Sequence, residues 1–95
     1  MEMKAIVCTK YGALTDLAVQ QVQIPAMAPG QIRIQVESIG VNFPDALLVK
    51  GLYQAKPDVP FIPGLECAGM VEAVGEGVNH LEIVQRVAAM SPDFG

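Results

Sequence analysis

Glycines and prolines divide this chain of 95 residues into short segments, most of which have the composition of β-strands. The clearest strand covers residues 31–39. There Ile32, Ile34 and Val36 alternate with polar residues, which is the period of two expected for a half-buried strand. We therefore predict five strands, over residues 4–8, 18–24, 31–39, 65–74 and 86–90.

Residues 42–49 have a different pattern, because Ala46, Leu47, Leu48 and Val49 cluster behind a proline. Pro44 suits the first turn of a helix, and Asn42 or its neighbour suits the cap. We predict one short helix here, ending near Lys50 and Gly51, followed by an extended loop over residues 53–63 and a ragged end over residues 91–95. Many short strands with one or two short helices predict a mainly β domain, closed or partly closed into a barrel.

The composition limits the kinds of function and partner that we expect for this chain. The length fits one domain, and a formal net charge of −4 without a basic run argues against nucleic-acid binding. No apolar run approaches the roughly 20 residues of a membrane span, so we expect no membrane partner. The apolar fraction of 52% is high for a small domain. Either a second domain or subunit covers the surplus, or a compact barrel buries it.

The two cysteines and the N-terminal sequence indicate the cellular compartment in which we expect the protein. Cys8 and Cys67 lie far apart, fit no metal-ligand spacing and occur in apolar runs. Free thiols of this kind suit a reducing compartment. The start, MEMKAIVCTK, lacks the apolar length and cleavage site of a secretory signal. We therefore expect a cytoplasmic location.

Several motifs along the whole chain carry a resemblance to a known family. They are GVNFPD at residues 40–45, GLY at residues 51–53, PGLECAG at residues 63–69 and VGEGV at residues 74–78. With them the chain resembles the front domain of medium-chain dehydrogenases/reductases, the superfamily of zinc alcohol dehydrogenases and zinc-free quinone oxidoreductases. The resemblance implies a GroES-like, partly open β-barrel spanning residues 1–95, the substrate-side catalytic domain of such enzymes.

Two positions separate the zinc enzymes from the zinc-free ones. Zinc alcohol dehydrogenases carry a cysteine where this chain has Asn42 and a histidine where it has Leu65. A catalytic zinc needs about three protein ligands from Cys, His and carboxylate. Glu66 is present, but one carboxylate does not hold the ion. We therefore predict that no residue here serves a metal and that the chain is zinc-free.

The resemblance also implies the site residues. In zinc-free quinone oxidoreductases the asparagine of a VN-x-x-D motif and the tyrosine of a GLY motif line the active cleft, which maps to Asn42, Asp45 and Tyr53. We predict a catalytic role for all three, with Asn42 and Tyr53 also contacting the cofactor. A hydride that reaches an enone or a quinone pushes negative charge onto the carbonyl oxygen, and the Asn42 amide and Tyr53 hydroxyl are donors that would stabilise it. The alternative is that Asn42 only caps a helix and Tyr53 is a rim aromatic.

The cofactor expectation follows from the same resemblance. We predict an NADPH-dependent quinone or enone oxidoreductase in which a Rossmann domain, absent from this sequence, binds most of the cofactor. The 95 residues alone are then expected to be inactive, and the full-length form is expected to be a homodimer. The competing hypothesis is a stand-alone GroES-like binding or assembly module without chemistry.

Other features of the sequence resemble functional motifs less closely. The segment VGEGVNH at residues 74–80 partly matches the nucleotide-binding motif G-x-G-x-x-G, but His80 stands where the third glycine would be. We therefore predict that Gly75 and Gly77 are turn glycines and that His80 is an exposed side chain. Glu66 is predicted to be a buried carboxylate paired with Arg86. Val84 replaces the glycine that relatives have at a turn, so this turn is expected to be rebuilt or strained.

Overall fold

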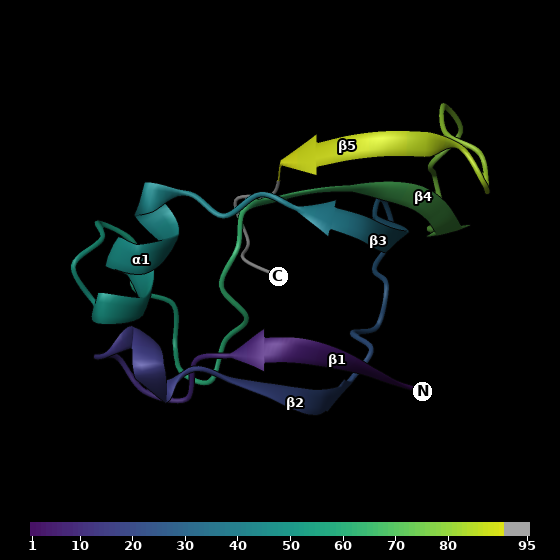
Figure 1. Cartoon of the computed structure of the whole chain (residues 1–95). Coiled ribbons are helices and arrows are strands. Elements are labelled where there is room, and N and C mark those ends of the chain that lie inside the picture. The colour runs from purple at the N-terminus through teal and green to yellow at the C-terminus, as the bar shows by residue number, and fades with distance from the viewer. Residues whose placement is uncertain (91–95) are drawn as a thin grey trace. The chain divides into compact units, whose positions relative to one another are not determined.

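The computed structural model describes residues 1–90, which divide into two compact units. The first comprises Met1–Ile24 and Val41–Leu65, and the second comprises Pro25–Gly40 and Glu66–Met90. Strands dominate both, which confirms the mainly β prediction. The predicted end over residues 91–95 lies outside the described part. In chain order the elements are β1 (Glu2–Val7), the 3-10 helix η1 (Leu14–Asp16), β2 (Ala18–Gln23), β3 (Ile32–Ile39), α1 (Phe43–Lys50), β4 (Glu66–Val74) and β5 (Arg86–Met90) (Figure 1).

The first unit combines a two-stranded sheet with α1 and a small apolar core. β1 and β2 pair antiparallel, with Glu2 opposite Gln23 and Val7 opposite Ala18. Just after β1, Cys8 pairs antiparallel with Phe61 in an isolated bridge, so the end of the N-terminal strand is bonded to the loop that follows α1. The buried core of this unit is Cys8, Leu48, Val49 and Phe61, with Tyr11, Leu17 and Tyr53 packed against it.

The start and end of α1 follow from its sequence. Asn42 occupies the N-cap in an extended conformation, Pro44 lies in the first turn, and Asp45 is the third helical residue of a capping box. At the other end Gly51 adopts a left-handed φ of 74°, which glycine tolerates best. The Leu52 amide then bonds to the Leu47 carbonyl at 2.9 Å, which closes the helix. The predicted helix is confirmed.

The second unit is an antiparallel three-stranded sheet in the order β3-β4-β5. Its register shifts twice along β3, between Arg33 and Ile34 and between Val36 and Ser38. Such irregularities turn side chains away from strict alternation. Val36 is 47% exposed. The first three residues of β3 are all half-buried and the last five are all exposed, so the predicted alternation of buried and exposed residues is wrong.

The turns of the second unit test two predictions, one about the turn glycines and one about Val84. Gly75 and Gly77 are turn glycines, as predicted, because the Val78 amide donates to the Gly75 carbonyl at 3.2 Å and Gly77 adopts a left-handed φ of 85°. A Cβ on Gly75 would also lie 2.7 Å from the carbonyl oxygens of Ala28 and Gln31. Val84 keeps a left-handed φ of 66° despite its branched side chain. The expected strain is therefore present in the backbone of this turn. No helix among residues 1–90 is long and apolar enough to cross a membrane.

Candidate functional site

Asn42 and Asp45, two of the three predicted site residues, are held together by the cap of α1. The Asn42 backbone amide donates to Oδ2 of Asp45 at 2.8 Å, and the Asp45 amide donates to the Asn42 carbonyl at 3.0 Å. The residue Asn42 itself is exposed. Two bonds therefore fix its backbone, and the amide group belongs to a residue at the surface of the first unit.

Asp45 is a buried carboxylate, with 8% of its surface exposed. Its Oδ2 accepts the Asn42 amide, whereas no described partner binds its buried Oδ1. A buried carboxylate oxygen without a donor is costly. Burial and the cap bond suit Asp45 to holding Asn42 in place.

Tyr53, the third predicted residue, lies in the loop beyond the opposite end of α1. The helix has eight residues, which at about 1.5 Å each makes it roughly 12 Å long. Tyr53 is half-buried and packs against the core of the first unit. The structure thus brings Asn42 and Asp45 together and places Tyr53 at the other end of the same helix.

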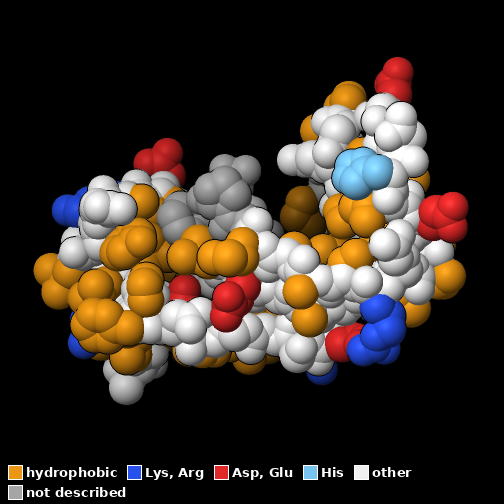
Figure 2. Space-filling view, turned by 90° about the horizontal axis from the view of Figure 1, so that it is seen from above, with side chains coloured by type: hydrophobic (Ala, Val, Ile, Leu, Met, Phe, Trp, Pro, Cys, Tyr) orange, Lys and Arg blue, Asp and Glu red, His pale blue; other side chains and the backbone are white. Residues whose placement is uncertain are grey.

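Exposed apolar side chains flank both candidate donors. Val41 and Phe43, on either side of Asn42, are 86% and 76% exposed, and Leu52, next to Tyr53, is 71% exposed. Hydrophobic side chains also gather at the surface on the side where α1 lies, as Figure 2 shows in orange. A polar donor surrounded by apolar surface suits an apolar ligand with a polar atom. The surplus apolar composition is thus at the surface, and over-burial does not account for it.

Tyr11, which the sequence did not single out, anchors the loop that carries Tyr53. Its hydroxyl donates to the carbonyl oxygen of Pro57, and its ring lies 5.9 Å from that of Phe61, centroid to centroid. Desolvation by its surroundings, followed by the nearby Cys8 thiol and Asp58 carboxylate, raises the pKa of the Tyr11 phenol above its ordinary value of 10.0. The signal available was an aromatic residue in the turn just after a strand, which carries little information alone.

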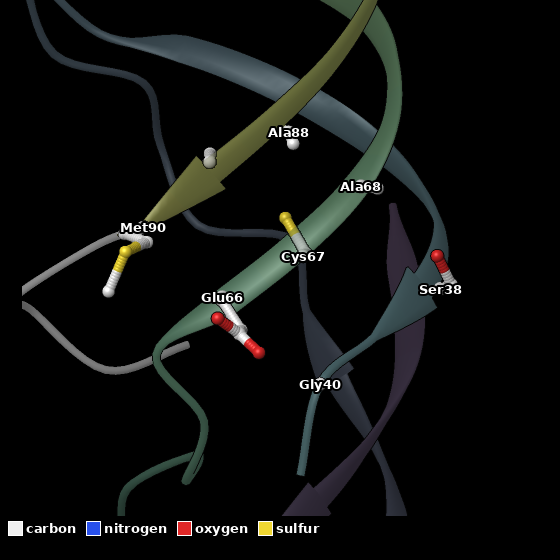
Figure 3. A pocket seen from close by; sticks show the side chains of 8 residues that line it. Ser38, Gly40, Glu66, Cys67, Ala68, Ala88 and Met90 are labelled. Carbon is white, nitrogen blue, oxygen red and sulfur yellow. The ribbon is translucent and has the colours of Figure 1, made fainter. Parts of the chain in front are cut away.

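A pocket of about 320 Å³ lies in the second unit, and none of Asn42, Asp45 and Tyr53 lines it. The Glu66 side chain leaves β4 toward the backbone of Gly40, where a Cβ would collide with its carboxylate (Figure 3). The lining of the pocket combines small side chains with the Glu66 carboxylate and the Cys67 thiol. No site role had been predicted for Cys67 from the sequence. The lining residues are Ser38, Gly40, Glu66, Cys67, Ala68, Ala88, Ala89 and Met90.

The predicted pairing of Glu66 with Arg86 is wrong. Arg86 lies opposite Met70 in the register of β4 and β5, whereas Glu66 lies opposite Met90. The Arg86 guanidinium instead donates to Glu37 at 3.0 Å. Glu66 is also half-buried, not buried as predicted.

The donor set does not fit a zinc ion. Within residues 1–90, no group of three or more His, Cys, Asp or Glu side chains is placed to hold a metal. Position 42 offers a neutral amide and position 65 a hydrocarbon, and neither is a ligand that zinc prefers.

The glycine-rich turn also does not fit a dinucleotide. A phosphate cradle needs open backbone amides. In this turn the Gly75 amide donates to the Gln31 carbonyl at 2.7 Å, and the Val78 amide donates to the Gly75 carbonyl at 3.2 Å. His80, which follows the turn, is exposed as predicted. The backbone of this turn is therefore bonded to residues 28–31, which precede β3.

Comparisons with known proteins agree with this fold. Residues 28–93 match the family described as Alcohol dehydrogenase GroES-like domain. The chain is 38% identical over 88 residues to a mouse protein, Synaptic vesicle membrane protein VAT-1 homolog-like (Mus musculus), covering 93% of this chain and 21% of the relative. The chain thus spans about a fifth of the length of this curated relative.

Two solved structures show the same fold. The human Synaptic vesicle membrane protein VAT-1 homolog-like protein matches with a TM-score of 0.93 and 36% identity, over 98% of this chain and 30% of that one. The quinone oxidoreductase of Escherichia coli, solved with NADPH, matches with a TM-score of 0.90 and 30% identity, over 97% and 28%. The predicted GroES-like fold is confirmed, although the strands within residues 1–90 form two separate sheets and no closed barrel. The chain belongs to the alcohol dehydrogenase GroES-like domain family, among the medium-chain dehydrogenases/reductases that include quinone oxidoreductases.

Proposed function

We propose that this chain is the substrate-side domain of a metal-independent, NADPH-dependent quinone or enone oxidoreductase. The observation that carries the proposal is the apolar surface beside both donors: Val41 and Phe43 flank Asn42, and Leu52 precedes Tyr53. Quinones and enones are largely apolar molecules with carbonyl oxygens that accept hydrogen bonds. The relatives described as quinone oxidoreductases support the same substrate class.

The chemistry assigned to this chain is charge stabilisation. NADPH, when bound, supplies a hydride. As the new C–H bond forms on the substrate, an electron pair moves onto its carbonyl oxygen, which later takes a proton from water. The Asn42 amide and the Tyr53 hydroxyl lie at opposite ends of α1, and each would donate to a carbonyl oxygen of the substrate at its own end. Asp45 would keep Asn42 in position by accepting a hydrogen bond from the Asn42 backbone amide. Donors aimed at developing charge act mainly on the transition state.

A separate domain is proposed to hold the cofactor, because the glycine turn at residues 74–78 is closed by the chain's own backbone. The isolated 95 residues should then bind NADPH weakly and reduce nothing. Titration calorimetry of the isolated chain tests this division of labour. Micromolar affinity for NADPH would contradict it.

A stand-alone binding or assembly module is the second candidate. Its support is the exposed apolar surface around α1, which could meet another protein as well as a substrate. The two candidates differ in what Asn42 and Tyr53 do, because a module without chemistry does not need both donors.

The deciding experiment expresses the complete reading frame that encodes this chain and measures NADPH oxidation with a panel of quinones and enones. Asn42→Ala and Tyr53→Phe are each expected to lower kcat about 100-fold, the usual effect of losing one such donor. Gln54→Ala, an exposed neighbour of Tyr53, is the matched control and should keep the parental rate. Absence of turnover on every substrate would favour the module.

A further inference from the structure

Residues 8–13, between β1 and η1, bond to both ends of the loop that carries Tyr53. The Gly12 amide donates to the Val49 carbonyl at 2.9 Å, just before the loop begins. At the far end Cys8 and Phe61 exchange two backbone bonds, of 2.8 and 3.0 Å. The ten residues between, 51–60, are named the Tyr53 loop below.

Tyr11 contacts this loop near its start, in its middle and just beyond its end. Its ring lies 3.4 Å from where a Cβ of residue 51 would stand, so it packs on the bare backbone of Gly51. Its hydroxyl donates to the Pro57 carbonyl, 46 residues away in sequence. Its ring then stacks at a tilt of 42° on Phe61, which belongs to the buried core.

We propose that Tyr11 is a positioning residue that fixes the Tyr53 loop and thereby the place of the Tyr53 hydroxyl. Tyr53 lies two residues after Gly51 and four before Pro57, between two points that Tyr11 touches. A loop held at its ends and middle has far fewer conformations than one held at its ends alone. The inference rests on the proposed function, since it assigns Tyr53 a role in the reaction.

Tyr11→Phe removes the hydroxyl and keeps the ring against Gly51 and Phe61, so the fold should survive. Hydrogen exchange of the Leu52 and Phe61 amides, which close the two ends of the Tyr53 loop, should accelerate by about tenfold through local opening. Amides of β4 should not change. Lys10→Gln, at the exposed neighbouring position, is the matched control and should leave the exchange as it is.

Turnover of the complete protein gives the second measurement. Tyr11→Phe should lower kcat about tenfold with KM within about twofold, because misplacing a catalytic group costs rate. In a Tyr53→Phe background the same change should have almost no further effect. Equal loss in both backgrounds would mean that Tyr11 acts independently of Tyr53, which overturns the proposal.

The two measurements separate the possible failures. Unchanged exchange at Leu52 and Phe61 overturns the anchoring of the loop, whatever the kinetics. Parental turnover by Tyr53→Phe overturns the proposed function and, with it, the catalytic consequence of Tyr11, while accelerated exchange in Tyr11→Phe would still establish the anchoring.

Discussion

Arg86 donates a hydrogen bond of 3.0 Å to Glu37, so an ion pair joins β5 to β3 across the intervening strand β4. Both side chains are exposed, Arg86 at 77% and Glu37 at 45%. Exposed pairs of this kind contribute only about 0–1 kcal/mol. The pairing explains why Arg86 does not serve Glu66.

The Arg86–Glu37 pair makes a prediction about stability. Arg86→Leu should lower the free energy of unfolding by less than about 1 kcal/mol, and high salt should abolish the difference. Urea denaturation at low and high salt measures this. A loss above about 3 kcal/mol would indicate a buried charge left without its partner.

Replacing Val84 is expected to increase stability, unlike replacing Arg86. Its φ of 66° is unfavourable for a branched residue, and Val84→Gly should raise the free energy of unfolding by about 1 kcal/mol because the strain is larger than the added entropy of the unfolded chain. Thermal and urea denaturation check this. Ile83→Gly, at the exposed neighbour, should destabilise the protein. A Val84→Gly variant no more stable than its parent would contradict the strain.

Asp45 should matter for stability as well as for the site. Asp45→Ala removes the acceptor of the Asn42 amide and should cost about 1–2 kcal/mol, as loss of a helix cap does. Asp16→Ala is the control, since Asp16 is in the first turn of η1 and has a long, exposed contact of 3.9 Å with Lys10. Equal stability of Asp45→Ala and the parent would mean that the cap contributes nothing.

The raised pKa of Tyr11 predicts a pH dependence. Because the folded state holds the phenolic proton more tightly than the unfolded state, stability is unaffected below pH 10.0 and falls as the pH rises from there through the folded-state pKa. The chain has two tyrosines and no tryptophan, so Tyr53→Phe leaves a single phenol whose absorbance can be titrated. Its midpoint should lie above 10.0. In Tyr11→Phe this part of the alkaline loss of stability should disappear.

The sequence predicted the local features of the fold well, because they depend on neighbouring residues. Alternation, proline and glycine located the strands and α1. The cap at Asn42 or its neighbour and the end near Lys50 and Gly51 followed from residue type around Pro44. The irregular register of β3 and the partner of Arg86 could not be predicted, because both depend on how strands align. The contact of Tyr11 with Pro57 joins residues 46 positions apart, and no local pattern encodes it.

The candidate site was predicted in part. Asn42 and Asp45 were named together from the VN-x-x-D motif, and the structure joins them through a capping box that was not predicted from the sequence. The apolar surroundings of Asn42 could be suspected from Val41 and Phe43, but their exposure depends on α1 burying its opposite side, at Leu48 and Val49. The pocket around Glu66 and Cys67 needs three strands to assemble, and so it lay beyond pattern analysis.

The most direct test of metal-independent reduction is to measure zinc content and turnover on the same purified protein, before and after treatment with a strong chelator. Because Asn42 and Leu65 stand where zinc ligands would be needed, the account predicts substoichiometric zinc and unchanged NADPH-dependent reduction of a quinone. One zinc per chain, with activity that is lost on chelation and restored by adding the metal, would contradict it.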